Sequence, residues 1–257
     1  MPPASPAPIP AAQFFASFDG TRLAWRELGE GRPVVLLHGF FSDARTNWLR
    51  YGHAAAIAGA GFRAIMPDLR AHGDSAKPHD AASYPPDALA RDGAALVAHL
   101  GLGDYDLAGY SLGARTVVRM LAGGAAPRRA ILSGMGFEGI TGASARTGFF
   151  RRVLTATIEF ERGSAEWAAT GFLKATKGDS AALVRILDTF VDTTETELAA
   201  IIQPTLVLCG AEDRDNGSAQ RLAEVLPNAH YEQVPGNHMN AVTKPELGAA
   251  MARFLAA

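Results

Sequence analysis

Short apolar runs alternate with amphipathic helical patterns along most of this chain. From residue 34 onward, runs and helical patterns follow one another in turn, which is typical of parallel strands joined by crossover helices. We therefore expect an α/β fold, with a mostly parallel eight-stranded sheet and helices on both of its faces. The expected strands cover residues 14–18, 23–27, 34–37, 64–66, 105–108, 130–132, 205–209 and 231–234.

Turn and helix signals add detail to this scheme. Asp19-Gly20, between the first two runs, is a strong two-residue turn signal and predicts a hairpin. Pro85 and Pro245 each open a segment with one apolar face, so we expect two helices that cover the sheet. The apolar faces carry Leu89, Gly93, Leu96, Val97 and Leu100 in the first segment, and Leu247, Met251, Phe254 and Leu255 in the second.

One connection is far longer than the others. The stretch between the strands expected at 130–132 and 205–209 has about 70 residues and only helical patterns, well beyond an ordinary connection. We interpret residues 135–202 as an inserted helical cap on a core made of residues 13–134 and 203–257. Residues 1–12 form a Pro/Ala-rich segment that we expect to be disordered.

Local signals mark helices inside this expected cap. Asp179 is an N-cap candidate, and Thr194 with Glu197 has the spacing of a capping box. An apolar face runs from Phe149 to Ile158. The cap should therefore consist of at least three short helices.

Composition narrows the range of functions. The 257 residues carry a formal net charge of −2, and no basic run is long enough to collect phosphates, so nucleic-acid binding is not expected. A single cysteine, Cys209, cannot form an internal disulfide and favours a reducing compartment. No segment is apolar enough for a signal peptide or a membrane span. We expect a cytoplasmic protein that acts on a small molecule, either as a monomer or as a homodimer.

A candidate nucleophile follows the strand expected at 105–108. The sequence Gly109-Tyr110-Ser111-Leu112-Gly113 lies between this strand and a helical pattern, which is the context of a nucleophile elbow. Both glycines suit a turn too tight for side chains, and the turn would leave Ser111 exposed. The alternative is an incidental glycine-serine turn.

A serine hydroxyl needs a base to take its proton, and the base needs a carboxylate to orient it. Asp213 and His238 each follow a late strand, so both should lie at the carboxyl edge of the sheet beside Ser111. Asp213 is the candidate acid and His238 the candidate base. Other carboxylates could serve as the acid, and His238 could instead be a hydrogen-bonded loop residue. These other carboxylates are Glu212, Asp215 and, less favoured, Glu138.

Acyl transfer also requires donors for an oxyanion. The backbone amide of Leu112, at the start of the helix after Ser111, can supply one. The His38-Gly39 turn after an early strand makes the amide of Phe40 the candidate for the second. The simpler alternative is that His38-Gly39 only turns the chain.

These motifs together resemble the α/β-hydrolase superfamily, in particular its small capped esterases and enol-lactonase-like members. The resemblance covers nearly all of the chain after the N-terminal segment, and it implies roles as nucleophile, acid and base for Ser111, Asp213 and His238. The segment from Asp68 to Ser75 also resembles a family signature, in which we expect Asp68 and Arg70 to form a buried ion pair. The matching motifs are His38-Gly39, residues 68–75, residues 109–113, residues 210–213 and His238.

The chain departs from the family at two positions. Ala71 and Asn237 stand where many relatives have glycine, and the second position could alter how His238 is presented. Serine at the elbow argues against haloalkane dehalogenase and epoxide hydrolase chemistry, because those relatives form an ester on an aspartate there. We expect neither a metal nor a cofactor, since the other histidines show no ligand spacing and no cysteine cluster exists.

Several aromatic residues lie in the expected cap and near the elbow, which indicates a largely apolar pocket. Phe41, Tyr110 and Trp167 are the candidate substrate-binding residues. The favoured activity is hydrolysis of a small carboxylic ester or lactone. A carbon–carbon bond hydrolase acting on dienoic acids and a perhydrolase would use the same triad. A ligand receptor that keeps the fold with little or no turnover is the alternative from another class.

Overall fold

The computed structural model describes residues 9–257 of the chain. Most of the segment that we expect to be disordered, residues 1–8, lies outside the described residues, and residues 9–12 lead into the first strand without regular structure. In the described part, no helix combines the length and apolarity needed to cross a membrane.

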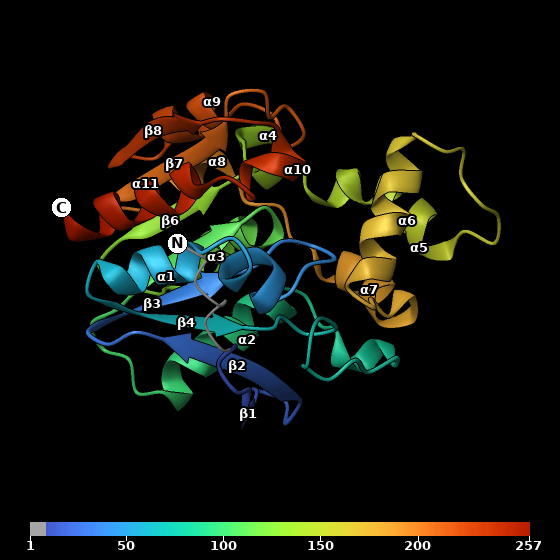
Figure 1. Cartoon of the computed structure of the whole chain (residues 1–257), viewed down its shortest axis with the longest axis horizontal. Helices are drawn as coiled ribbons and strands as arrows, with labels where there is room; N and C mark the ends of the chain where they lie inside the picture. Colours follow the sequence, from blue (N-terminus) through green and yellow to red (C-terminus); the bar gives the residue numbers. More distant parts are fainter. Residues whose placement is uncertain (1–8) are drawn as a thin grey trace, which may run out of the picture.

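The described residues form one eight-stranded sheet in the order β1-β2-β4-β3-β5-β6-β7-β8. β2 pairs antiparallel with both β1 and β4, and all other neighbours are parallel (Figure 1). The expected strand set and the mostly parallel sheet are confirmed. The strands are β1 (Gln13–Ala16), β2 (Arg22–Leu28), β3 (Arg32–Leu37), β4 (Phe62–Pro67), β5 (Asp106–Tyr110), β6 (Ala130–Ser133), β7 (Thr205–Gly210) and β8 (Ala229–Val234).

The hairpin of β1 and β2 forms as expected, but its turn is longer than two residues. The last pair of the ladder joins Ala16 to Arg22, which leaves residues 17–21 in the loop. The side chain of Asp19 accepts the backbone N–H of Thr21 and also pairs with the guanidinium of Arg70. These contacts hold Asp19 in a wider loop, so the two-residue turn was wrong.

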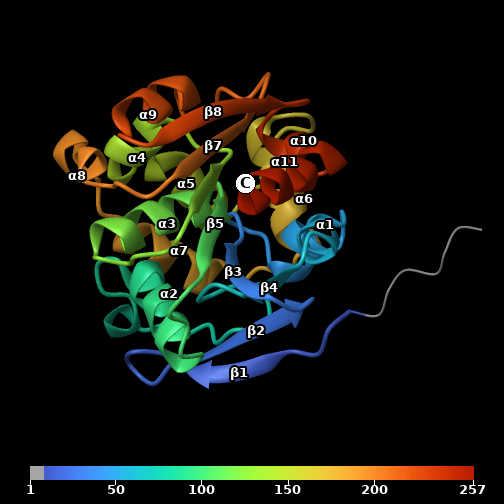
Figure 2. The same ribbon diagram turned by 90° about the vertical axis from the view of Figure 1, so that its left-hand side faces the viewer.

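Helices cover both faces of the sheet, as Figure 2 shows. α1 and α11 pack together on one face, and α2, α3 and α9 lie on the other. The helices after Pro85 and Pro245 are confirmed as α2 and α11. The helices are α1 (His53–Gly59), α2 (Ala88–His99), α3 (Leu112–Ala122), α4 (Phe137–Thr141), α5 (Gly148–Thr155), α6 (Ala165–Ala175), α7 (Ser180–Ile186), α8 (Glu195–Ala199), α9 (Ala219–Val225), α10 (His238–Ala241) and α11 (Pro245–Ala256).

Only helices connect β6 to β7, and they fall into two groups. α5, α6 and α7 pack on one another and stand apart from the sheet at the right of Figure 1. α4 and α8 instead pack against α3 and α9, beside the sheet. The protruding cap therefore consists of α5 to α7, while the two ends of the insertion extend the core.

The local signals inside the insertion have mixed outcomes. Asp179 caps α7 by accepting the N–H of Ala182, and Thr194 caps α8 in a full capping box, both as expected. The apolar face from Phe149 does not reach Ile158, because Ala156 takes an extended conformation and ends α5. Ile158 is 76% exposed.

The expected Asp68–Arg70 ion pair is not formed. β4 ends at Pro67 and the chain then turns through Ala71, whose φ of 69° is the left-handed conformation that glycine adopts most easily. The turn sends the two side chains to different partners. Asp68 pairs with Arg26 of β2 at 3.1 Å, and Arg70 pairs at 2.7 Å with each of two other carboxylates, those of Asp19 and Asp92.

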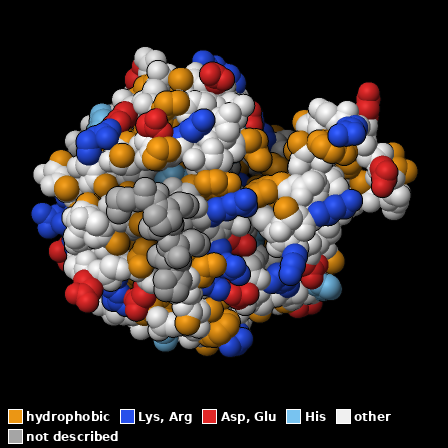
Figure 3. All heavy atoms as spheres, viewed as in Figure 1, with side chains coloured by type: hydrophobic (Ala, Val, Ile, Leu, Met, Phe, Trp, Pro, Cys, Tyr) orange, Lys and Arg blue, Asp and Glu red, His pale blue; other side chains and the backbone are white. Residues whose placement is uncertain are grey.

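Acidic and basic side chains are interspersed on the face that Figure 3 shows, in keeping with the small net charge. Hydrophobic side chains gather on this face where the cap helices join the core. This junction lies over the carboxyl edge of the parallel strands, where ligands bind in open α/β sheets.

Candidate active site

Ser111 occupies a strained turn between β5 and α3. Its backbone has φ 53° and ψ −113°, an unusual conformation for a residue with a side chain. A Cβ on Gly113 would lie 1.9 Å from the carbonyl oxygen of Leu37, and one on Gly109 would lie 2.2 Å from the carbonyl carbon of Gly113. Both glycines are therefore required by close backbone approach, as the sequence predicts for an elbow.

Ser111, His238 and Asp213 lie within hydrogen-bonding distance in series. The Nε2 atom of His238 is 3.0 Å from Oγ of Ser111, and its Nδ1 atom is 2.8 Å from Oδ2 of Asp213. The three residues follow β5, β8 and β7, whose carboxyl ends meet at one edge of the sheet. The structure thus brings together the three side chains that the sequence singles out.

Asp213 is buried, and two interactions keep it ionised. Burial alone would raise the pKa of its carboxyl, but the hydrogen bond and charge of His238 lower that pKa below its ordinary value. The backbone N–H of Asp215 adds a second hydrogen bond, to Oδ1 at 3.0 Å. An ionised Asp213 favours the tautomer of His238 in which Nδ1 carries the proton, and this leaves Nε2 free to accept one.

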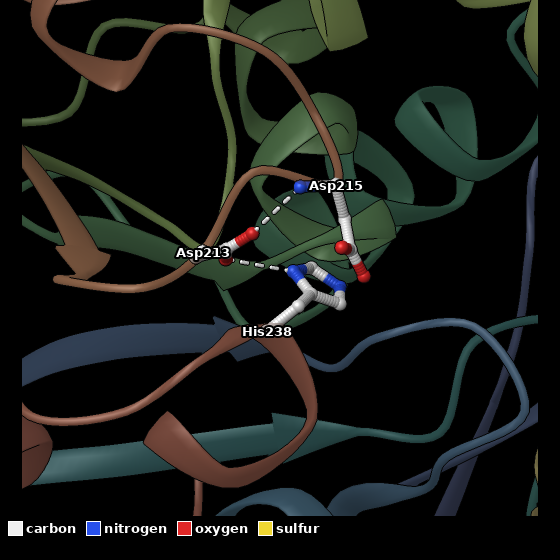
Figure 4. A group of neighbouring side chains, drawn as sticks. All are labelled: Asp213, Asp215 and His238. Carbon is white, nitrogen blue, oxygen red and sulfur yellow. Dashed lines mark hydrogen bonds and ion pairs between the residues drawn. The ribbon is translucent and has the colours of Figure 1, made fainter.

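The other carboxylates considered from the sequence lie differently. Glu138 accepts the backbone N–H of Ser218 at 2.8 Å, and Glu212 is exposed. Asp215 is close: one of its carboxylate oxygens lies within 4.8 Å of both a ring nitrogen of His238 and an oxygen of Asp213. Figure 4 shows the Asp215 carboxylate beside the ring edge of His238 that carries Nε2, away from the Asp213 contact.

Asp213, Asp215 and His238 are residue types that can ligate a metal. Their donor atoms lie within 4.8 Å of one another. However, Nδ1 of His238 and Oδ2 of Asp213 are already hydrogen-bonded to each other, so a metal ion would have to displace that contact. The arrangement fits an oriented base better than a metal centre.

Two contacts that sequence analysis missed hold His238 in place. The Tyr110 hydroxyl donates a hydrogen bond of 2.6 Å to the backbone carbonyl oxygen of His238. Asn237 caps α10 by accepting the N–H groups of Met239 and Asn240, and the Asn240 side chain accepts the N–H of Asn237 in return. The Asn-x-x-Asn spacing was a visible signal of this box. Asn237, one of the two expected departures from the family pattern, therefore serves as a helix cap.

The backbone amides of Phe40 and Leu112, the predicted oxyanion donors, have no hydrogen-bond acceptor among the described residues. Leu112 is the first residue of α3, where an amide has no partner within the helix, and no acceptor contacts the amide of Phe40 among the described residues. Asn47, which sequence analysis also missed, fixes the turn before Phe40, because its Oδ1 accepts the N–H of Gly39 at 3.1 Å.

The buried side chain of His38 stabilises the same turn through two hydrogen bonds. Its Nδ1 donates to the carbonyl oxygen of Gly39 at 2.8 Å, and its Nε2 accepts the N–H of Leu69 at 3.0 Å. Burial lowers the pKa of His38, so the ring stays neutral and can make both contacts at once. His38 is thus a structural residue of the turn.

A cavity of about 210 Å³ opens beside Ser111 and His238. Tyr110 lines it, as expected of a substrate-binding residue. The other two candidates do not: Phe41 is 3% exposed and packs on Phe40 and Phe150, and Trp167 on α6 is 46% exposed at the surface. The other apolar lining residues are Phe40, Phe172, Met239 and Val242, and the polar ones are Ser42, Thr46, Asn47, Tyr51 and Thr243.

Comparison with known proteins shows which family has this architecture. The model of the "Alpha/beta hydrolase family" matches residues 34–250, which is most of the chain. The chain belongs to the alpha/beta hydrolase family. The expected resemblance and fold class are confirmed.

Two curated relatives match nearly full length. A non-heme haloperoxidase from Rhodococcus erythropolis is 30% identical over 260 residues, covering 87% of this chain and 91% of the relative. Non-heme chloroperoxidase CPO-A1 from Kitasatospora aureofaciens is 30% identical over 256 residues, covering 85% and 89%. This hydrolase is therefore similar over most of its length to two proteins named as non-heme peroxidases.

Solved structures with the same fold include named ester-cleaving enzymes. An esterase from Rhodococcus sp. ECU1013 has a TM-score of 0.72 at 26% identity, and covers 95% of this hydrolase and 98% of its own chain. The enol-lactonase from Burkholderia xenovorans LB400 has a TM-score of 0.73 at 20% identity, with coverages of 95% and 100%. At such identities the second structure supports the fold alone.

Proposed function

We propose that this hydrolase cleaves carboxylic ester or lactone bonds of small, largely apolar acyl substrates. The observation that carries the proposal is the series of contacts from Ser111 through His238 to Asp213 at the wall of a cavity large enough for a small acyl compound. An oriented serine next to such a cavity suits acyl transfer. Similarity to a named esterase supports the same reading.

The proposed reaction has two halves. Nε2 of His238 takes the proton of Ser111 while Oγ attacks the carbonyl carbon, and the amides of Phe40 and Leu112 stabilise the oxyanion. The imidazolium, stabilised by Asp213, then protonates the leaving alkoxide, and the acyl group stays on Ser111. A water molecule, deprotonated by His238, attacks this ester and releases the carboxylic acid.

A fluorophosphonate probe tests the machinery without knowledge of the natural substrate. Intact-mass analysis and peptide mapping should show one adduct, on Ser111, and the Ser111→Ala variant should show none. Ser42→Ala is the matched control, because Ser42 lines the same cavity and should be neither labelled nor required for labelling. Hydrolysis of short-chain 4-nitrophenyl esters should be lost with Ser111→Ala. Folded protein with no adduct would overturn the proposal.

A second candidate activity is perhydrolysis, favoured by the two nearly full-length relatives named as non-heme peroxidases. Hydrogen peroxide in place of water would attack the acyl group on Ser111 and release a peracid, with His238 returning the proton to Oγ. The test measures oxidation of bromide in the presence of acetate and peroxide. Bromide oxidation that disappears in Ser111→Ala would support this activity, and oxidation retained by that variant would exclude a serine route.

Two alternatives remain outcomes of these experiments. Labelling of Ser111 without release of acid from any ester would favour the carbon–carbon bond hydrolase or the ligand receptor on the same fold. We also propose a cytoplasmic location, supported by the free and buried Cys209, which suits a reducing compartment.

A further inference from the structure

Among the described residues, those that line the cavity beside Ser111 include no lysine or arginine that could hold an anion. Among the residues that line it, His238 is the only titratable group apart from the two tyrosines, Tyr51 and Tyr110. We infer that this hydrolase selects substrates without a carboxylate, and that Asp215 is a specificity-determining residue that disfavours anionic ones. This inference rests on the proposed ester-cleaving function and deepens it.

The cavity walls offer hydroxyl and amide groups in place of charges. Ser42 and Thr46 contribute hydroxyl groups and Asn47 contributes its amide, whereas the Thr243 hydroxyl already donates to the carbonyl oxygen of Asn240. These groups can hydrogen-bond a neutral oxygen of the substrate. They cannot offset the free-energy cost of removing a carboxylate from water. Proteins that bind carboxylates usually offset this cost with an ion pair to an arginine or a lysine. An anionic acyl group would therefore enter this cavity at a considerable cost in affinity.

The Asp215 carboxylate does not line the cavity, but it adds repulsion beside the reacting end, next to His238. It lies within 4.8 Å of a ring nitrogen of His238, on the Nε2 side that faces Ser111 (Figure 4). Its carboxylate oxygens form no hydrogen bond or ion pair with the part of the chain that the structure describes. Because Asp215 is solvent-exposed, its effect on a bound anion should be moderate.

Two guanidinium groups lie near this loop, and both are directed to backbone atoms. Arg146 of the segment before α5 donates to the carbonyl oxygen of Asp215, and Arg214 donates to the carbonyl oxygen of Asp213. Neither arginine lines the cavity. They therefore hold the loop in shape without offering a partner to an anion bound beside Ser111.

This charge pattern discriminates among the candidate activities. Two of the candidate substrates carry a carboxylate: the dienoic acids of the carbon–carbon bond hydrolase alternative and the acetate of the perhydrolysis test. Such a compound would place an unpaired anion in a cavity that lacks a cation. The inferred substrate class is a small neutral ester or lactone, with an oxygen-bearing group that faces the hydroxyl-lined wall.

The experiment uses two methyl esters of equal heavy-atom count that differ in charge: methyl 4-oxopentanoate, which is neutral, and monomethyl succinate, which is anionic at pH 7.5. For each ester, kcat/KM is measured by release of methanol, and slowing of fluorophosphonate labelling is measured in parallel as a binding readout. We expect the neutral ester to be preferred at least about tenfold, because it avoids an unpaired buried charge. Equal kcat/KM values, or equal protection from labelling, would overturn the inference.

Variants test which charged residues cause the preference for the neutral ester. Asp215→Asn should reduce about threefold the ratio of kcat/KM for the neutral ester to kcat/KM for the anionic ester. In the unmodified protein, 0.5 M NaCl should also reduce this ratio, because salt screens exposed charges. Met239→Lys, which adds a cation to the cavity wall, should reduce the ratio further. Glu212→Gln removes an exposed charge from the same loop and should leave the ratio unchanged. An unchanged ratio in both Asp215→Asn and Met239→Lys would contradict the role of charge.

The same measurements separate this inference from the proposed function. Absence of the fluorophosphonate adduct would reject the activated Ser111 itself. An adduct on Ser111 together with equal kcat/KM values for the two esters would retain the proposed function and reject only the selection by charge.

Discussion

The hydroxyl of Tyr110 donates a hydrogen bond of 2.6 Å to the backbone carbonyl oxygen of His238, and their rings lie 5.6 Å apart. The residue before the proposed nucleophile, Ser111, therefore holds the residue proposed as its base. Tyr110→Phe removes only the hydroxyl, at a net cost of about 1 kcal/mol for one hydrogen bond. We expect kcat to fall about fivefold with little change in KM, because the loss affects the position of His238 more than substrate binding.

Tyr231→Phe is the control for this measurement. It also removes a tyrosine hydroxyl, one that contacts Gln233 on the exposed edge strand β8, far from Ser111 in the sheet order. Its kcat on a 4-nitrophenyl ester should match that of the unmodified protein. If both variants lost activity equally, the contact of Tyr110 with His238 would have no special part in catalysis.

Asp213→Asn tests which carboxylate orients the base. An amide in this position can donate to Nδ1 of His238 and so favour the tautomer whose Nε2 cannot accept the proton of Ser111. We expect kcat to fall by roughly 10³- to 10⁴-fold at neutral pH, with the fold retained by circular dichroism. Full activity in Asp213→Asn, combined with inactivity in Asp215→Asn, would transfer the role to Asp215.

Gly113→Ala tests the geometry of the elbow. The added Cβ would lie 1.9 Å from the carbonyl oxygen of Leu37, so either α3 or β3 must shift. We expect the free energy of unfolding to fall by about 3 kcal/mol, as overpacking in a core does, and esterase activity to disappear. Gly148→Ala at the start of α5 meets no atom within 4 Å and should leave stability unchanged or raise it by about 0.5 kcal/mol. Equal stabilities of the two variants, measured by urea unfolding, would contradict the steric argument.

The meeting of Ser111, His238 and Asp213 could be predicted from the sequence because each of the three belongs to a local pattern. Ser111 is framed by two glycines between a strand and a helix, and Asp213 and His238 each follow a strand. Parallel strands bring their carboxyl ends to one edge whatever the details of the loops. Knowledge of the strand order was therefore not needed to expect that these three side chains meet.

Contacts between distant segments could not be predicted in the same way. Arg70 finds Asp19 and Asp92 rather than the carboxylate two residues away, because the turn after β4 separates the side chains of neighbouring residues. The lining of the cavity depends on how the cap sits on the core. Trp167 and Phe172 lie on the same helix, yet only Phe172 reaches the cavity, and local periodicity carries no information on that docking.

The thiol of Cys209 should be inert in the folded protein. Burial raises its pKa to about 12, and the neighbouring Asp213 carboxylate adds to the rise. The thiolate is therefore a very minor form at pH 8, so iodoacetamide at that pH should leave the native protein unmodified. The same reagent in 6 M guanidinium chloride should alkylate Cys209 completely, as intact mass will show. Rapid alkylation of the native protein at pH 8 would contradict the burial of this thiol.

The contacts of Arg70 predict a large loss of stability when its side chain is removed. Arg70 is fully buried, and its guanidinium binds the buried carboxylate of Asp92 and the partly buried one of Asp19. Arg70→Ala would leave the buried carboxyl of Asp92 without its cation and with only the hydroxyl of Ser17 as a partner, which costs about 3–5 kcal/mol for buried pairs of this kind. Arg253→Ala breaks an ion pair of 2.6 Å with Glu232 at the surface, where the arginine side chain is 64% exposed, and should cost less than about 1 kcal/mol. Urea unfolding of both variants at pH 7 measures the difference in their free energies of unfolding. A similar, small loss of stability in both variants would show that burial does not make the contacts of Arg70 more stabilising than those of Arg253.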